Sequence, residues 1–195
     1  VALIDEGWGD RIPWRERFDL VGIGAMTSQA PRAYELADRF RRRGATVVLG
    51  GSHASVCLDE ALEHADAVVI GEAERSWPRL LEDLARGRLR RRYRSSHPAR
   101  GWYVPPRRDL VRGDVSIGVR PVLASRGCPR SCTFCSVHHV FGREPRRRGV
   151  DAVATEIEQL ARQGARSLIF LDDNLLGDPA CARQLLRRLR PLGLR

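Results

Sequence analysis

The N-terminal part of the chain alternates between short apolar runs and segments whose apolar side chains recur at helical spacing. Runs of strand length lie at residues 1–4, 20–26, 46–49 and 67–70. Residues 30–43 and 77–85 show the helical spacing beside charged side chains, and residues 58–63 are long enough for a short helix. Because strands that alternate with crossover helices pair in parallel, this pattern predicts an α/β fold with an open, doubly wound parallel sheet.

The pattern divides the chain into three parts. Residues 1–87 form the predicted sheet domain, and residues 88–118 are dominated by Arg, Ser, Pro and Gly, which is typical of a linker. Residues 119–195 again alternate, with strands expected at 120–125 and 167–171 and helices at 150–163 and 179–189. Two such units cannot close a barrel. Because the chain begins at Val1 and its sole methionine is Met26, we expect an internal fragment.

The charge pattern argues against a nucleic-acid partner despite a formal net charge of +10. All 34 basic residues are arginine, which indicates a compositional bias rather than a surface selected for phosphate. Aromatic residues make up 6% of the chain and do not interleave with the arginine clusters, as a base-stacking surface would require. No apolar run approaches the length of about 18 residues that a membrane span needs, and we expect a cytoplasmic protein.

Three of the five cysteines lie within eight positions, in the sequence GCPRSCTFC. Cys128, Cys132 and Cys135 follow a predicted strand, and three thiolates on one short loop can bind three irons of a four-iron cluster and leave the fourth open. The alternative is a zinc site completed by His138 or His139. We favour the cluster, because structural zinc sites usually gather their ligands as two separated pairs. Cys57 and Cys181 are expected to be non-ligands.

The motif C-x-x-x-C-x-aromatic-C after a first barrel strand resembles the signature of the radical S-adenosylmethionine (SAM) superfamily. The resemblance implies that Cys128, Cys132 and Cys135 bind a 4Fe-4S cluster, whose open iron holds SAM and cleaves it reductively to a 5′-deoxyadenosyl radical. It places Phe134 beside the adenine of SAM. The stretches CSVHHVFGREPRRRGVDAVATEIEQL and SLIFLDDNLLGDP are similar to the helix and second strand that follow the motif in a large bacterial subgroup.

The end of that second strand carries Asp172, Asp173 and Asn174. In the superfamily, polar groups at this place hold the SAM ammonium, often in a Gly-Gly-Glu run that this chain lacks. The resemblance therefore implies that these three residues bind SAM. The alternative is a turn at the strand end with Asn174 as a cap.

Polar and glycine residues follow each predicted strand of the N-terminal domain, where open parallel sheets bind ligands. Gly50 and Gly51 would allow a bulky ligand to approach the backbone closely. The full set of candidate binding residues at these strand ends is Met26, Thr27, Ser28, Gly50, Gly51, Ser52, His53, Gly71 and Glu72.

The stretches LVGIGAMTSQAPRAYELADRFRRRGATVVLGGSHAS and ADAVVIGEAERSWPRLLEDL resemble the Rossmann-like cobalamin-binding domain that precedes the barrel in cobalamin-dependent radical SAM enzymes. The resemblance implies that the candidate residues at the strand ends bind cobalamin. Gly50-Gly51 matches a Gly-Gly of cobalamin domains, whereas Gly24-Ala25-Met26 replaces the usual Ser-x-Leu. We expect His53 and His64 to be surface or loop histidines rather than cobalt ligands.

Together the resemblances imply a cobalamin-dependent radical SAM enzyme in which the sheet domain precedes the start of a partial (β/α) barrel. Its expected cofactors are a 4Fe-4S cluster, SAM and cobalamin. Its expected reaction is methylation of an unactivated carbon of a small molecule, such as a lipid or natural-product intermediate, with flavodoxin or ferredoxin as reductant. The alternatives are a radical SAM enzyme with a vestigial cobalamin domain, acting in rearrangement, cyclisation or methylthiolation, and a basic zinc-containing nucleic-acid-binding module. The residues that catalyse the reaction are not evident from the sequence.

Overall fold

The computed structural model describes residues 1–94, 103–110 and 119–195, and the rest of the predicted linker lies outside these ranges. The chain forms two units. One consists of Arg11–Val104 with His139–Phe141, and we call it the N-terminal unit. The other, the C-terminal unit, consists of Val1–Asp10, Pro105–His138 and Gly142–Arg195.

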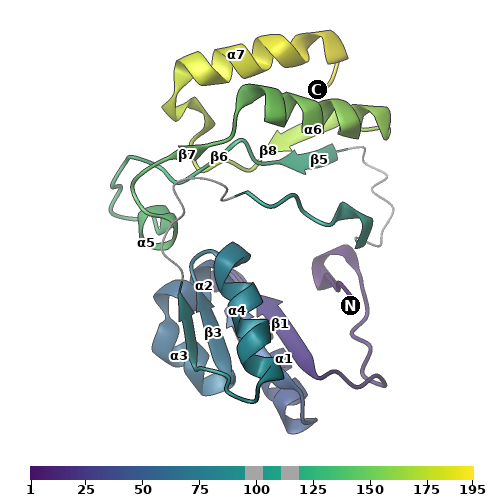
Figure 1. Ribbon diagram of the computed structural model, residues 1–195, viewed down its shortest axis with the longest axis vertical. Coiled ribbons are helices and arrows are strands. Elements are labelled where there is room, and N and C mark those ends of the chain that lie inside the picture. Colours follow the sequence, from purple (N-terminus) through teal and green to yellow (C-terminus); the bar gives the residue numbers. More distant parts are fainter. Residues whose placement is uncertain (95–102, 111–118) are drawn as a thin grey trace. The chain divides into compact units, whose positions relative to one another are not determined.

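The N-terminal unit is built on a four-stranded parallel sheet in the order β1-β2-β3-β4 (Figure 1). The predicted strands are β1 (Leu20–Gly24), β2 (Thr46–Gly50) and β3 (Ala67–Ile70). Leu20 pairs with Thr46, so that β1 and β2 run in register over their full length. The predicted open parallel sheet is therefore present.

Both faces of this sheet are covered by helices, because the side chains of each central strand alternate between two apolar cores. Val47 and Leu49 point into one core, which they share with α1 (Ala30–Arg42), α2 (Gly51–Val56) and α3 (Leu58–His64). Val48 points into the other core, where it meets Leu80 of α4 (Ala73–Ala85). This arrangement is a doubly wound α/β sheet.

Two parts of the chain differ from the pattern expected for the strands. Residues 1–4 do not form a strand and are exposed, and the Asp5 carboxylate that follows them accepts a hydrogen bond from the Gly7 N–H at the start of the 3₁₀ turn Glu6–Trp8. In contrast, β4 (Arg92–Arg94) was not expected, because it lies among arginines. Tyr93 at its centre is buried, and its hydroxyl donates a hydrogen bond to the buried Asp83 carboxylate at 3.1 Å.

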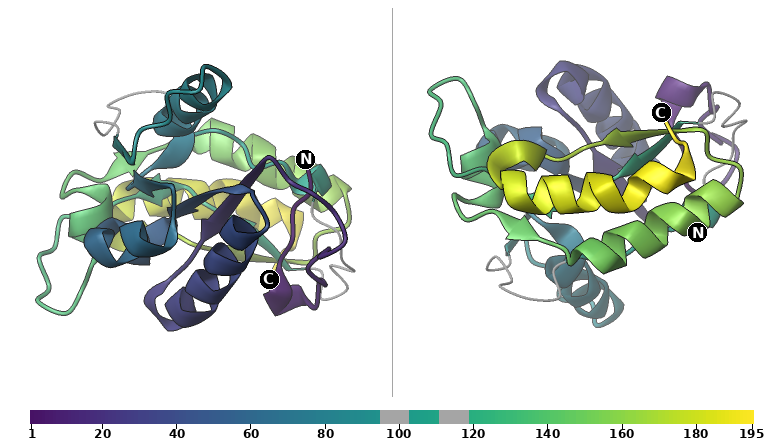
Figure 2. Two further views of the ribbon diagram at one scale, coloured as in Figure 1. Left: turned by 90° about the horizontal axis from the view of Figure 1, so that it is seen from below. Right: turned by 90° about the horizontal axis from the view of Figure 1, so that it is seen from above.

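The C-terminal unit contains two short sheets and two long helices. Strand β5 (Val119–Val122) pairs in parallel with β8 (Ser167–Phe170), and β6 (Ser125–Arg126) pairs antiparallel with β7 (Arg146–Arg147). Helices α6 (Val150–Arg162) and α7 (Pro179–Leu189) lie side by side over the β5–β8 pair (Figure 2). The remaining elements are α5 (Val137–Phe141) and the 3₁₀ turns Thr27–Gln29, Arg108–Leu110, Leu175–Gly177 and Arg190–Leu192.

The strand expected at 120–125 is divided into β5 and β6. Ala124 lies between them, and its N–H donates to a carboxylate oxygen of Asp172 at 3.0 Å instead of joining a strand ladder. The β-α-β-α order of this unit, β5-α6-β8-α7, is that of the first two units of a (β/α) barrel.

Many arginines bind groups of their own chain. Arg41 pairs with Asp66 at 3.2 Å and donates to the Glu63 carbonyl, and Arg148 pairs with Glu156 at 2.6 Å.

In the parts of the chain that the structure describes, no helix combines the length and apolar character needed to cross a membrane.

Candidate functional sites

The carboxyl ends of β1 and β2 are joined by hydrogen bonds between backbone groups. The Ala25 N–H donates to the Gly50 carbonyl at 3.2 Å, and the His53 N–H donates to the Ala25 carbonyl at 3.2 Å. The candidate residues 26–28 and 50–53 are therefore neighbours at one edge of the sheet, as expected for parallel strands. Met26 is exposed at this edge.

The third strand end joins the same edge through Ser55, a residue that was not among the sequence candidates. The Ser55 hydroxyl donates to the Gly51 carbonyl at 2.7 Å and accepts a hydrogen bond from the Gly71 N–H at 2.9 Å. The next residue, Glu72, is buried at the start of α4. The sequence carries no signal of this role, because a serine hydroxyl inside a helix can bond to the carbonyl four residues before it without contacting another strand end.

The two glycines at the end of β2 differ in the space that their surroundings leave for a side chain. Gly51 has φ +90°, and a Cβ added there would lie 2.6 Å from the Ala25 carbonyl oxygen and 2.8 Å from the Ala25 nitrogen. A Cβ on Gly50 would make ordinary contacts, at 3.7 Å from the Val69 carbonyl oxygen. Glycine is therefore required at Gly51 by the chain's own backbone, and not only by a ligand.

His53 is buried in α2, so the expectation of a surface or loop histidine is wrong for this residue. Its Nδ1 lies 3.3 Å from the Thr27 hydroxyl oxygen, and its Nε2 lies 2.9 Å from the Tyr34 hydroxyl oxygen. Burial raises the pKa of Tyr34 to about 12, with a further contribution from the neighbouring Glu60 carboxylate. His64, at the end of α3, is half-buried, and its Nδ1 lies 3.0 Å from an Asp38 carboxylate oxygen.

The cysteine motif lies in an irregular loop between β6 and α5. Cys128, Cys132 and Cys135 are all half-buried, and the Cys135 N–H donates to the Cys132 carbonyl at 3.1 Å, which closes a turn between the last two cysteines. The side chain before the last cysteine, Phe134, is 91% exposed. An aromatic ring in this position has its face available to a ligand rather than packed in the core.

Side chains at the end of β8 hold this loop. The Asp172 carboxylate accepts hydrogen bonds from the Ala124 N–H at 3.0 Å and the Ser125 hydroxyl at 2.5 Å. The Asp173 carboxylate accepts from the Gly127 N–H at 2.8 Å. These bonds tie the segment before Cys128 to a strand end more than forty residues away in the sequence.

Asn174 continues the same connection to a cysteine of the motif. Its side-chain N–H donates to the Cys128 sulfur at 3.6 Å. Asn174 also occupies the N-cap position of the turn Leu175–Gly177, but its side chain makes no capping hydrogen bond. The side chain is therefore directed to the cysteine loop rather than to the turn that follows it.

The spacing of the three loop cysteines bears on the zinc alternative. Ligands of one zinc ion approach it to about 2.0–2.3 Å and therefore lie within about 4 Å of one another. Among the residues that the structure describes, the group of three potential ligand atoms within 4.8 Å of one another consists of His53, Cys57 and Glu60, and the loop cysteines form no such group.

The N-terminal unit and the chain as a whole match known proteins. Residues 14–81 match the family model of the B12 binding domain. Bacteriochlorophyllide d C-8(2)-methyltransferase of Chlorobaculum tepidum is 39% identical over 82% of this chain and 37% of its own length. Bacteriochlorophyllide d C-12(1)-methyltransferase of the same organism is 32% identical over the whole of this chain and 45% of its own length. The chain thus spans less than half the length of these relatives.

The fold also resembles a solved structure over almost its full length. The radical S-adenosylmethionine methyltransferase TsrM from Kitasatospora setae, solved with a tryptophan substrate and a SAM analogue bound, superimposes with a TM-score of 0.71. The match has 22% sequence identity and covers 94% of this chain and 41% of TsrM. The chain thus contains a B12 binding domain, and as a whole it is similar to the two bacteriochlorophyllide d methyltransferases in sequence and to a radical S-adenosylmethionine methyltransferase in fold.

Proposed function

We propose that this chain is part of a cobalamin-dependent radical SAM methyltransferase that methylates an unactivated carbon of a small molecule. The observation that carries the proposal is the pair of candidate sites: a cysteine loop braced by the end of β8, and a B12-type sheet edge in the other unit. When bound, the cluster supplies the electron that splits SAM into methionine and a 5′-deoxyadenosyl radical, and cobalamin carries the methyl group.

The cysteine loop fits a 4Fe-4S cluster. Three half-buried thiols on a loop without regular structure can each turn toward a different iron, which leaves the fourth iron for SAM. In this proposal Cys128, Cys132 and Cys135 are the ligands. Asn174 donates a hydrogen bond to the Cys128 sulfur, and hydrogen bonds to cluster sulfurs are among the features that set a cluster's reduction potential.

Phe134 and the two aspartates that follow β8 have different contacts, which support different roles in binding SAM. The exposed ring of Phe134 can stack on adenine. The Asp172 carboxylate already accepts two hydrogen bonds, so we propose that it acts chiefly by positioning the loop. Asp173 is exposed and accepts one bond from Gly127, which leaves lone pairs for the SAM ammonium.

For cobalamin, the strand ends of the N-terminal unit offer an open edge. A Cβ at Gly24 would meet nothing within 4 Å, and Met26, two residues further along the chain, is exposed. We propose that the corrin or its tail lies along the backbone of residues 26–28 and 50–53, with Gly71 and Glu72 as further contacts. Gly50 has the room to test this placement without disturbing the chain.

The remaining components follow from this chemistry. A cluster of this kind requires a low-potential electron donor, and we propose a flavodoxin or ferredoxin. Free thiols on the cysteine loop require a reducing compartment, so we propose that the protein acts in the cytoplasm. The substrate is a small molecule such as a lipid or a natural-product intermediate.

Anaerobic reconstitution of the full-length protein tests the proposal. We expect broad iron–sulfur absorption, about four irons per chain, bound cobalamin, and release of 5′-deoxyadenosine from SAM when a reductant is added. Cys128→Ala should abolish the iron and the SAM cleavage, whereas the matched control Cys181→Ala, which changes a cysteine of α7, should keep both.

Two results would overturn the proposal. A colourless protein that binds zinc at the loop would make it a zinc-containing module. Normal SAM cleavage in a protein that never takes up cobalamin would favour the vestigial domain, with rearrangement, cyclisation or methylthiolation as its reaction.

A further inference from the structure

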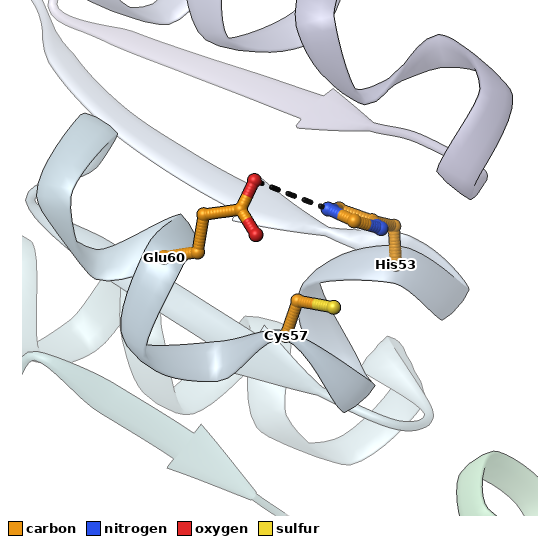
Figure 3. A group of neighbouring side chains, drawn as sticks. All are labelled: His53, Cys57 and Glu60. Carbon is orange, nitrogen blue, oxygen red and sulfur yellow. Dashed lines mark ion pairs between the residues drawn. The ribbon is translucent and has the colours of Figure 1, made fainter.

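Three side chains with the donor atoms that transition metals prefer lie together on the N-terminal unit, away from the cysteine loop in sequence. They are His53, Cys57 and Glu60, and their ligand atoms all lie within 4.8 Å of one another (Figure 3). One imidazole nitrogen, one thiol sulfur and one carboxylate oxygen form a mixed donor set of the kind that binds Zn²⁺.

The local backbone explains why these residues converge. The Cys57 N–H donates to the His53 carbonyl at 2.8 Å, and the Ala61 N–H donates to the Cys57 carbonyl at 3.0 Å. Cys57 therefore closes the last turn of α2 and opens the first turn of α3. His53 lies one helical turn before Cys57, and Glu60 lies in the first turn of α3, which begins directly after Cys57.

The orientation of the imidazole is fixed from the opposite side. Its Nδ1 lies 3.3 Å from the Thr27 hydroxyl oxygen, so that Nε2 is turned toward Cys57 and Glu60. Metal-binding histidines are commonly held in this way, with the second nitrogen bonded to a protein group. Nε2 lies 3.8 Å from the Glu60 carboxylate oxygen, close to the separation of about 3.4 Å expected for two ligands of one zinc ion.

The Tyr34 hydroxyl contacts two of these three side chains. The Tyr34 hydroxyl lies 2.9 Å from Nε2 and also bonds the Glu60 carboxylate. The Tyr34 hydroxyl has a single proton, and whether it donates to Nε2 or accepts from it depends on the tautomer of His53. Glu60 is 55% exposed at its side chain.

We propose that His53 Nε2, Cys57 Sγ and the Glu60 carboxylate bind one divalent transition-metal ion, with Zn²⁺ as the best match and water in the fourth position. Binding releases the thiol proton of Cys57 and displaces the Tyr34 hydrogen bond from Nε2. Its ligands are distinct from the three loop cysteines. His53 is also one of the residues proposed to line the cobalamin edge, but metal binding here does not require the proposed enzymatic reaction.

Cobalt titration tests this site most directly. The full-length protein carries the changes Cys128→Ser, Cys132→Ser and Cys135→Ser, which removes the loop thiols and leaves Cys57 and Cys181 among the five cysteines of this chain. It is stripped with a chelator and titrated with Co²⁺ under anaerobic conditions. We expect a thiolate-to-cobalt charge-transfer band that saturates at one ion per chain and disappears when Zn²⁺ is added.

Variants in this background assign the ligands. Cys57→Ser should abolish the band and Cys181→Ser should leave it unchanged. Glu60→Gln, at an exposed position, should weaken Zn²⁺ binding by more than about tenfold, since even the outer partners of metal ligands contribute about 10- to 100-fold. Unchanged far-ultraviolet circular dichroism confirms that the variants fold. Absence of the band in the Cys57-containing protein, or its persistence in Cys57→Ser, would overturn the proposal.

Discussion

The two candidate sites are held in place by different kinds of bond. In the N-terminal unit, the ends of β1 and β2 are joined by backbone hydrogen bonds that require a glycine at Gly51. In the C-terminal unit, the cysteine loop is held by side chains of β8's end, with Asp172 and Asp173 bonded to groups 46 to 48 residues away. The strand ends of the N-terminal unit should therefore be sensitive to changes in backbone conformation, and the cysteine loop to changes in the side chains that hold it.

The largest effect should come from breaking the backbone contact of the first edge. Gly51→Val places a side chain where a Cβ would lie 2.6 Å from the Ala25 carbonyl oxygen, at φ +90°. Strain and overpacking together should cost about 3 kcal/mol or more of the free energy of unfolding. Chemical denaturation of the full-length protein measures this cost.

Gly50→Ala is the matched control, because its Cβ would make only ordinary contacts. We expect it to leave the free energy of unfolding nearly unchanged, so that any loss of cobalamin in this variant reports on the ligand and not on the fold. Equal denaturation midpoints for Gly51→Val and Gly50→Ala would show that the close approach of Gly51 to Ala25 is not a constraint.

The next largest effect should come from removing the Asp172 carboxylate, which helps to hold the cysteine loop. Asp172→Ala leaves the buried Ala124 N–H without its acceptor and removes the partner of the Ser125 hydroxyl, which should destabilise the unit by about 1–3 kcal/mol. We also expect lower iron retention after reconstitution. Asp151→Ala, an exposed carboxylate on α6, is the control and should retain full iron. Full iron and parental stability in Asp172→Ala would contradict the bracing role.

A subtler effect should follow at the sulfur of Cys128. Asn174→Leu removes a hydrogen bond to this sulfur, and such bonds stabilise the more negative, reduced cluster. We therefore expect the cluster to assemble with a lower reduction potential, measured by a redox titration followed by electron paramagnetic resonance. The same potential in the parent and in Asn174→Leu would show that the bond does not reach the cluster.

The smallest effect should be a pH dependence confined to the C-terminal unit. The Cys181 N–H, followed by the Arg147 guanidinium, holds the pKa of the Asp178 carboxyl below its ordinary value at the start of α7. Because the pKa of Asp178 is lower in the folded than in the unfolded protein, its carboxylate contributes to stability above the unfolded pKa of about 3.9. This contribution is lost as the pH falls through the lower pKa of the folded protein.

Asp178→Asn keeps a cap that does not titrate, so we expect it to reduce the loss of α7 stability below about pH 4. Hydrogen exchange at α7 measured across this range checks the result. In α1–α4 of the N-terminal unit the first-turn caps make no side-chain hydrogen bond, so no matching change is expected there. An identical acid profile for parent and variant would show that the cap does not respond to protonation.

The sequence predicted the elements with clear periodicity and strong end signals. Helix α7 was expected at 179–189 and occupies Pro179–Leu189, because Pro179 marks its first turn and apolar side chains recur on one face. Helix α2 was not expected, since its six residues GSHASV are small or polar and span less than two turns. Strand β4 was hidden among arginines, and its place depends on Tyr93 bonding to Asp83.

The candidate sites could be placed but not fully explained from sequence. Parallel topology puts the ends of β1, β2 and β3 at one edge, so the candidate residues there could be selected from the strand pattern alone. The hydrogen-bond partners of Asp172 and Asp173 could not be predicted from the strand pattern, because these bonds depend on the break between β5 and β6 near Ala124. The burial of His53 likewise depends on α2.

The central claim is that the two units hold separate cofactor sites, and counting iron and corrinoid in one anaerobically reconstituted sample tests it most directly. We expect the parent to bind both, at about four irons per chain. The variant Cys128→Ala, Cys132→Ala, Cys135→Ala should lose the iron and keep the corrinoid. Iron that remains in this variant, or corrinoid that disappears with the iron while the protein stays folded, would contradict the account.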